Sequence, residues 1–375
     1  MFGINKLGVI FLLLCYFISG HAQSVDNILI KQPIKTAGTF VKRTRGFLGT
    51  MGWLLNNLDS AYVEPNHYNY AAMLQNSKDF EYYQFKTRSR DGIPSQRLVF
   101  TPDYHYKLGI YFGWSFLFFG LNMDMDKLLN NKKAESNQTD YQLNIYSSII
   151  SADLFYYKGG NTYKLHDLSG FGPEYDKNYS ANIIDVLNVD MKGINAYWVF
   201  NHRRFSYLAA YSQTTEQLRS AGSFIAGFSF SQHDVGFNPS NLPDSIRVRL
   251  NDYLHINEIK YSDYSLNFGY AYNWVFAKHW LAAISLAPAI AYKVTKEQSK
   301  SNRLSAVFHR FNADFVGRSG IVWNNGLYYA GASFVSNNYS YRENDLNLYN
   351  GIGTLKIYAG FNFGMKRKYK ILKDL

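Results

Sequence analysis

The stretch from Ser262 to Val294 constrains the fold more than any other part of this sequence. In its first half, large apolar side chains occupy the even positions and small ones the odd positions, and the alternation returns after a short break. A period of two residues is typical of β-strands with two different faces. A turn centred on Lys278 would pair Phe276 with Trp280 and place both bulky sets on one uncharged face. That face is apolar enough to contact lipid, while the opposite face is small and polar.

The composition agrees with a chain of alternating strands. Aromatic residues make up 18% of the 375 residues, with 32 Tyr and 28 Phe, and charged residues make up another 18%. The mean hydropathy of -0.26 excludes a protein of membrane-spanning helices, but the two faces of a barrel strand average out. We count about 12 strands, within a range of about 10 to 14, and their length suits a tilted strand that crosses a membrane. The sequence therefore predicts an all-β fold, a transmembrane antiparallel β-barrel over residues 61–365.

The first 22 residues have the pattern of a secretory signal peptide. Lys6 precedes an apolar run from Leu7 to Ile18, and small residues follow at Gly20 and Ala22. This order is typical of a cleavable export signal. The single cysteine, Cys15, lies inside the signal and follows Leu14, which disfavours lipid attachment. The exported chain would then contain no cysteine and no disulfide.

A short amphipathic helix is expected within the N-terminal leader, residues 23–60. Phe47, Met51, Leu54, Leu55 and Leu58 lie on one face of a helical pattern. One role for such a helix is to lie in the membrane interface or to plug the barrel. The other, which we favour, is to pack on the domain as an ordinary short helix.

The net charge of +11 does not indicate a nucleic-acid partner. Five basic residues gather in the C-terminal tail, residues 366–375. The sequence contains no basic helix, zinc-ligand spacing or RNA-binding motif. We therefore expect no nucleic-acid binding and interpret the tail as a solvated end.

Two short turns and several long polar loops suggest the asymmetry of an outer-membrane barrel. The strands Ile194–Phe200 and Phe205–Tyr211 would form a hairpin around His202, a counterpart of the hairpin around Lys278. Short turns lie on the periplasmic side of such barrels and long loops lie outside. Strict alternation would then place the long segment Asp234–Ile259 on the periplasmic side. Either this segment is a periplasmic insertion or a strand is missing from the count.

Four stretches of the chain resemble a known family. They are Tyr62–Tyr70 continuing to Asn76, Tyr104–Trp114, Asn201–Tyr207 followed by Arg219–Ser223, and Asn267–Trp274. The sequence resembles domain of unknown function family 4421, found in exported proteins of certain Gram-negative bacteria. The resemblance covers about Asp59 to Gly364. It implies an outer-membrane barrel and implies no activity, cofactor or site residue.

The sequence contains few candidates for catalysis. The Gly-x-Ser-x-Gly elbow, the His-Glu-x-x-His motif and the phosphate-binding loop are all missing. His166 with Asp167, or His233 with Asp234, could act together with a serine as the catalytic residues of a lipid hydrolase. Such a site needs a His that is hydrogen-bonded to Ser and oriented by a third polar group. Loop histidines beside Asp are more often solvated. We therefore assign no catalytic, cofactor or metal residue.

One further cluster and the aromatic residues have two interpretations each. Glu64, Pro65 and His67 could form a polar cluster at the barrel mouth, although Pro65 more simply ends a turn.

The aromatic excess is interpreted as girdles at the lipid interfaces, with Trp274 and Trp280 near a turn. Its alternative is a sugar-stacking surface on a soluble β-sandwich.

Three functions follow from these observations. The first is an integral outer-membrane barrel, monomeric, that passes a small solute or binds a ligand inside the barrel. Its expected partners are outer-membrane lipid, the barrel-assembly machinery and a small-molecule solute. The second is an outer-membrane lipid hydrolase, and the third is a soluble secreted binding module. The small residues Gly269, Ala271, Ala283 and Ala287 would leave space inside the barrel, either for a channel or for a plug.

Overall fold

The computed structural model describes residues 58–366 except 90–93, 103–105, 115–116, 125–138, 176–178, 256, 296–310 and 344. The expected signal peptide, the leader helix before residue 58 and the tail after residue 366 lie outside the described residues. The described helices are short, and none of them is long and apolar enough to cross a membrane.

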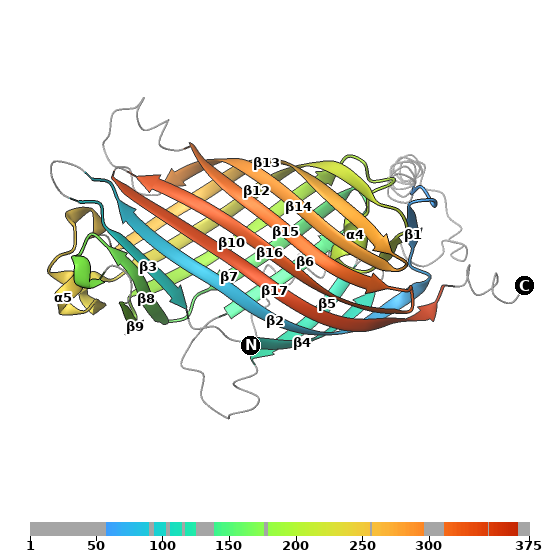
Figure 1. The fold of residues 1–375 in the computed structure, drawn as a ribbon, viewed down its shortest axis with the longest axis horizontal. Helices are drawn as coiled ribbons and strands as arrows, with labels where there is room; N and C mark the ends of the chain where they lie inside the picture. Colours follow the sequence, from blue (N-terminus) through green and yellow to red (C-terminus); the bar gives the residue numbers. More distant parts are fainter. Residues whose placement is uncertain are drawn as a thin grey trace, which may run out of the picture. The chain divides into compact units, whose positions relative to one another are not determined.

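Twelve antiparallel strands form a closed barrel (Figure 1). Closure comes from β17, which pairs with β2 from Leu346 opposite Thr87 to Met365 opposite Tyr68. This pairing leaves neither β2 nor β17 as an open edge. Within the described residues, β5 and β6 are joined at a single pair, Leu117 with Ile145. The wall strands in chain order are β2 (Tyr68–Thr87), β4 (Tyr106–Trp114), β5 (Leu117–Asp124), β6 (Thr139–Tyr146), β7 (Ile150–Lys158), β10 (Leu187–Val199), β12 (Ala221–Phe237), β13 (Glu258–Ala277), β14 (Trp280–Thr295), β15 (Phe311–Asn324), β16 (Tyr328–Glu343) and β17 (Leu346–Met365). This arrangement confirms the predicted barrel and excludes the alternative of a β-sandwich.

The two ends of the barrel differ. At one end, which we call the turn end, lie Tyr68 and Met365 together with short connections such as Ala277 to Trp280. At the opposite end, the loop end, lie long connections. These contain β3 (Arg97–Pro102), β8 (Thr162–Ser169), η1 (Pro173–Tyr175), β9 (Ser180–Ile184), η2 (Pro239–Asn241), α5 (Asp244–Arg247) and η3 (Asp252–Leu254). Lys278 lies at the turn end, as predicted.

The hairpin that the alternation predicted is present, with one difference at its turn. Trp274 pairs with Ala282, but Ala277 rather than Phe276 pairs with Trp280, because a bulge lies between Val275 and Ala277. The turn is therefore tighter than a turn centred on Lys278. Trp274 and Phe276 are both exposed, as predicted for alternate residues of the outward face.

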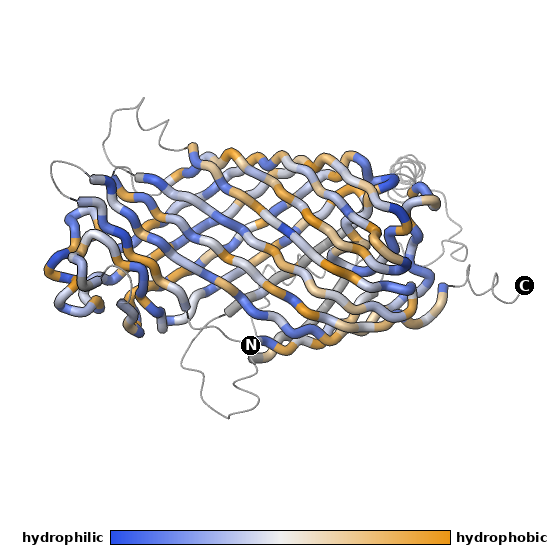
Figure 2. Tube along the Cα trace, viewed as in Figure 1, coloured by the Kyte–Doolittle hydropathy of each residue, from blue (hydrophilic) through white to orange (hydrophobic). Residues whose placement is uncertain are grey.

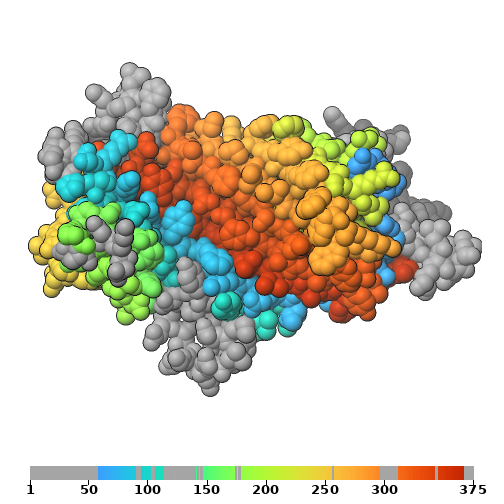
Figure 3. All heavy atoms as spheres, in the orientation of Figure 1, coloured from blue at the N-terminus to red at the C-terminus, as the bar shows by residue number. Residues whose placement is uncertain are grey.

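Hydrophobic and hydrophilic residues alternate along the wall strands (Figure 2), and their burial follows the two faces that the alternation predicted. On β13 and β14 the small and polar residues are buried on the inside. Leu266 and Ile290 are the most exposed outward side chains of this pair, at 70% and 69%. The outward face forms a belt of exposed aromatic and aliphatic residues: Tyr264, Leu266, Phe268, Tyr270, Tyr272, Trp274, Phe276, Trp280, Ile284, Leu286, Ile290 and Val294. In the space-filling view, the side chains of β14–β17, coloured orange to red, pack side by side across the middle of the visible face (Figure 3).

Polar residues of the wall strands are poor guides to strand boundaries. The polar run Asn76–Asp79 has the composition of a turn but lies within β2, where Ser77 and Asp79 face the lumen. The real turn between β6 and β7 lies at Ser147, which is closed by its hydrogen bonds to Ile150. Since a barrel has a polar interior, polarity alone does not distinguish a turn from a lumen-facing stretch.

The predicted hairpin around His202 was wrong, and its correction resolves the topology. Residues 205–211 are not a wall strand: they lead into α4 (Tyr207–Tyr211). β12 therefore follows β10 directly around the wall and ends at Phe237. The connection from Phe237 to Glu258 thus lies at the loop end, opposite Lys278. It contains α5 and η3.

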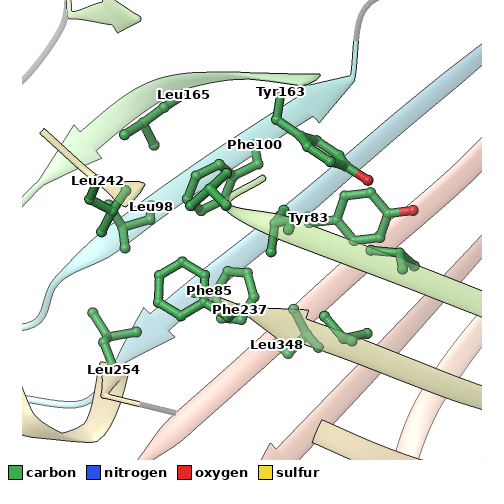
Figure 4. Packing of buried hydrophobic residues seen from close by; sticks show 14 of the residues in the cluster. Tyr83, Phe85, Leu98, Phe100, Tyr163, Leu165, Phe237, Leu242, Leu254 and Leu348 are labelled. Carbon is green, nitrogen blue, oxygen red and sulfur yellow. The ribbon is translucent and has the colours of Figure 1, made fainter. Parts of the chain in front are cut away.

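A hydrophobic core, which we call the cap, closes the loop end (Figure 4). Phe237 stacks on Phe85 with ring centroids 4.9 Å apart, and Phe100 packs edge-on against both. Leu254 and Leu242 from the β12–β13 connection pack on the same cluster. The cap joins the loop-end halves of the wall strands to β3, β8 and β9.

Candidate functional site: the plugged lumen and its polar chamber

Residues 200–220, the plug, fold back from the turn end into the barrel. Ser206 begins α4 because its hydroxyl accepts a hydrogen bond from the Ala209 amide, the arrangement of a helix N-cap. The segment then returns along β11 (Thr215–Gln217), which pairs with β1 (Val63–Pro65). The plug is thus made of a short helix and a two-stranded ribbon.

The plug fills the space that the small residues of the hairpin leave. Tyr207 and Phe205 pack against Ala271 and Ala287, and α4 packs against Ala283. The Tyr207 hydroxyl is 2.7 Å from Ser285 Oγ on β14. The expected space inside the hairpin is therefore real, and residues 200–220 occupy it.

Side-chain hydrogen bonds attach the plug to the wall. Gln217 Oε1 accepts from the Ser206 amide at 2.9 Å and from Asn273 Nδ2 at 3.1 Å. Gln217 Nε2 donates to the Tyr62 and Arg204 carbonyls. Because one buried amide satisfies several groups, Gln217 is the centre of this attachment.

Charged residues form a buried layer between the plug and the cap. Lys293 Nζ contacts Asp263 and lies 3.1 Å from Asp314 Oδ2, and all three side chains are at most 4% exposed. Arg318 forms an ion pair with Asp153 and lies over the Tyr197 ring. Burying charges is unfavourable unless they are paired, and each of these charges has a partner of opposite sign.

A chamber of about 90 Å³ lies beside this layer. Arg318, Lys356, Asp79, Glu81 and Asp153 bring both signs of charge to its lining, together with the amides of Asn195 and Asn337. Within the described part of the chain, Asp153 Oδ1 and Asn337 Oδ1 have no hydrogen-bond partner. The chamber can hold a few water molecules or a small polar solute that supplies donors.

The two His–Asp pairs considered for hydrolysis do not assemble a triad. His166 Nδ1 is 3.3 Å from Asp167 Oδ2 on β8, and the described contacts bring no serine hydroxyl to it. His233 Nε2 is 2.8 Å from Ser231 Oγ, but its Nδ1 has no partner among the described residues. Asp234 points to the outer face, where it pairs with Lys260. The Ser–His pair lies inside the barrel, away from the lipid that a lipid hydrolase must reach.

Glu64, Pro65 and His67 do meet at the barrel mouth. They line a second cavity, at the turn end, together with Glu216 and His279. The described residues contain no group of three or more His, Cys, Asp or Glu that could hold a metal ion.

The plug and the buried ion pairs were missed at the level of sequence, although a signal for the ion pairs exists. Asp263 and Lys293 occupy the same parity as the small residues of the hairpin, so the alternation already places them inside. For the plug, the N-cap serine before a helix-compatible Tyr-Leu-Ala-Ala run was the available signal.

Several solved structures are similar to this chain, all at low sequence identity. The outer membrane protease OmpT from Escherichia coli shares 8% identity, with 79% of this chain and 97% of that chain covered and a TM-score of 0.36. The translocator domain of the autotransporter NalP from Neisseria meningitidis shares 9%, with 87% and 99% covered and a TM-score of 0.28. The outer membrane protein OprG from Pseudomonas aeruginosa shares 8%, with 80% and 98% covered and a TM-score of 0.24. No curated protein matches the sequence.

The family assignment agrees with the resemblance found in the sequence. A family model described as a domain of unknown function, DUF4421, matches residues 57–363. Three of the four stretches that carry the resemblance meet at the plug, since Tyr62, Ser206 and Asn273 are joined through Gln217 and its hydrogen bonds. The chain therefore belongs to the DUF4421 family and has the fold of an outer-membrane β-barrel.

Proposed function

We propose that this protein is a monomeric outer-membrane barrel that binds a small polar solute in its mid-lumen chamber, with the plug as the gate. The apolar outward belt supports a lipid environment. The short turns lie at the same end of the barrel as its first and last residues, Tyr68 and Met365. In bacterial barrels the short turns are periplasmic. The plug would then face the periplasm and the cap the outside.

The single observation that carries the proposal is a charged chamber enclosed between two different closures. An open pore needs a continuous lumen, whereas here the plug fills one half and the cap core the other. The plug is held by hydrogen bonds and contacts with small residues rather than by ladder pairing to the wall. It can therefore move while the barrel stays closed.

Both signs of charge in the chamber favour a zwitterionic solute. Arg318 and Lys356 suit an anionic group, and the carboxylates of Asp153 and Asp79 suit a cationic one. Binding titrations with glycine, the smallest amino acid, would test this with the full chain in detergent. We expect saturable binding and about tenfold or greater loss in the double variant Asp153→Asn/Arg318→Met, which removes both charges together.

The matched control is Asp234→Asn/Lys260→Met, which removes an ion pair from the outer face. It should bind glycine as the unchanged protein does. If glycine does not bind, or binds equally to both double variants, the proposed chamber function is wrong.

Passage of a solute across the membrane is the second candidate, and it requires the cap to open as well. Liposomes that contain the protein should retain entrapped solute at rest. A steady leak from the unchanged protein would favour passive passage instead.

A further inference from the structure

The second cavity, of about 160 Å³, is built from several parts of the chain that meet at the turn end. The plug supplies Gln213, Thr215 and Glu216, and the segment before β2 supplies Glu64 to His67. The wall supplies the rest: His279, Asn324, Asn325, Gly326 and Asn362. This cavity is separate from the chamber of the proposed function and does not require the plug to move.

Two carboxylates face each other across the ribbon that borders this cavity. Glu64 of β1 and Glu216 of β11 are direct partners in an antiparallel pair, so their side chains lie on the same face. Like charges in this position repel each other. Each carboxylate contacts one imidazole: Glu64 Oε1 is 3.0 Å from His67 Nε2, and Glu216 Oε1 is 2.6 Å from His279 Nδ1.

An independent observation points to a hydrogen-bond donor from a ligand. Asn362 lines the cavity and is 1% exposed. Its Nδ2 donates to the Gly326 carbonyl at 2.8 Å, whereas its Oδ1 has no partner within the described part of the chain. A buried acceptor without a donor is unfavourable, and a bound N–H group would satisfy it.

The charges around the cavity fix the sign of the ligand. Among the described residues that line it, two are Glu and none is Lys or Arg. Lys366 lies nearby, where its Nζ donates to the Asn66 carbonyl at 2.8 Å, and does not line the cavity. A carboxylate pair with an amide acceptor suits a positive group with several N–H donors.

From these features we infer that the turn-end cavity is a binding site for a small cation bearing N–H donors, an ammonium or guanidinium group. Glu64 and Glu216 hold the charge, and Asn362 Oδ1 accepts one N–H. Such a group can come from a free amine or from a basic side chain of a peptide. The chemistry at the cavity is the same in both cases.

Calorimetric titration of the full chain in detergent with 1,4-diaminobutane tests the site. We expect saturable binding, and a loss of affinity of about tenfold or more in Glu216→Gln and in Glu64→Gln. The matched control, Glu258→Gln, removes a carboxylate that pairs with Lys260 at the loop end and should leave the affinity unchanged. The neutral 1,4-butanediol and the anionic succinate should not bind.

A second titration, with a blocked peptide that contains one lysine, separates the two sources. Binding of the peptide at least as tight as that of the diamine assigns the site to a peptide side chain, and binding of the diamine alone assigns it to a free amine. Folding of each variant is checked by its heat-modifiable mobility on a gel. Should Glu216→Gln fail to fold, Glu64→Gln carries the test, because the Glu64 side chain is 43% exposed.

Three results would overturn the inference. The first is no binding of the diamine to the unchanged protein. The second is an affinity of the folded Glu64→Gln and Glu216→Gln variants for the diamine that equals the affinity of the unchanged protein. The third is equal binding of the diol, which would show that the charge is not recognised.

Discussion

The two ends of this barrel are closed by opposite means. At the loop end, the cap is a core of buried aromatic and aliphatic side chains. Many of these side chains belong to the wall strands themselves. At the turn end, the plug packs in two smaller apolar clusters, against alanines and β-branched residues of the wall, and its polar attachment centres on the amide of Gln217. Burial of a large apolar side chain stabilises the folded state by about 1.5–3 kcal/mol. The net contribution of a hydrogen bond is about 1 kcal/mol.

This difference suggests that the two closures have different roles. Opening the cap would unpack a core that also holds the wall strands together. Opening the plug would break side-chain hydrogen bonds and two smaller apolar clusters but would leave the ladder pairs between wall strands intact. We therefore expect the plug, rather than the cap, to be the closure that opens.

The largest expected effect comes from a matched pair of phenylalanines, Phe237 in the cap and Phe205 in the plug, each 1% exposed. Phe237→Ala should lower the free energy of unfolding by about 3–5 kcal/mol. Phe205→Ala removes a similar side chain, but the plug can open before the barrel unfolds, so we expect a loss of about 1 kcal/mol. Urea unfolding followed by tryptophan fluorescence measures both. Equal losses would mean that the plug unfolds together with the wall.

A second pair tests whether the exposed belt faces lipid. Leu286 lies in the middle of the belt on β14, opposite Tyr270, whereas Val248 is 83% exposed at the end of α5. In lipid, Leu286→Arg should lower the free energy of unfolding by about 2–4 kcal/mol. Val248→Arg should change it by less than about 0.5 kcal/mol. Similar, small effects at both positions would argue that the belt is exposed to water.

The third effect is smaller and local to the plug. Gln217→Ala removes the side-chain amide that joins the Ser206 amide, Asn273 and three backbone carbonyls, so we expect the plug to be destabilised by about 1–3 kcal/mol. Limited proteolysis within residues 200–220 should become about tenfold faster, with unchanged heat-modifiable mobility. The variant Gln232→Ala, on the same wall at the outward face of β12, is the control and should be cleaved at the normal rate.

Much of the wall could be predicted from the sequence, because each wall strand has an apolar outward face and a small or polar face toward the lumen. The alternation from Ser262 to Val294 predicted a hairpin, its outward face and the pairing of Trp274 with Ala282. The same argument failed at Phe205–Tyr211, where a short alternating stretch is also compatible with a helix. Local sequence could not show that this segment packs inside the barrel, because its partners Ala271, Ala283 and Ala287 lie far along the chain.

The candidate site was less predictable than the wall. Glu64, Pro65 and His67 were recognised as a cluster, but Glu216, His279 and Asn362 join them only through closure of the barrel. Asp153 and Arg318 are 165 residues apart in the chain and meet across the lumen. Long-range contacts of this kind are set by strand order and register, which a single sequence does not fix.

The most direct test of the central claim, that the plug is the movable gate of a closed chamber, uses neighbouring alanines that face opposite ways. Ala283 is buried against α4, and Ala282 lies on the outward face of the same strand. Asn195→Cys places a thiol in the chamber lining, which a water-soluble maleimide can label only if the chamber opens. We predict slow labelling in the otherwise unchanged barrel, labelling at least about tenfold faster when Ala283→Phe displaces the plug, and no acceleration with Ala282→Phe. Equal labelling rates in the two folded phenylalanine variants, or rapid labelling without either, would contradict the account.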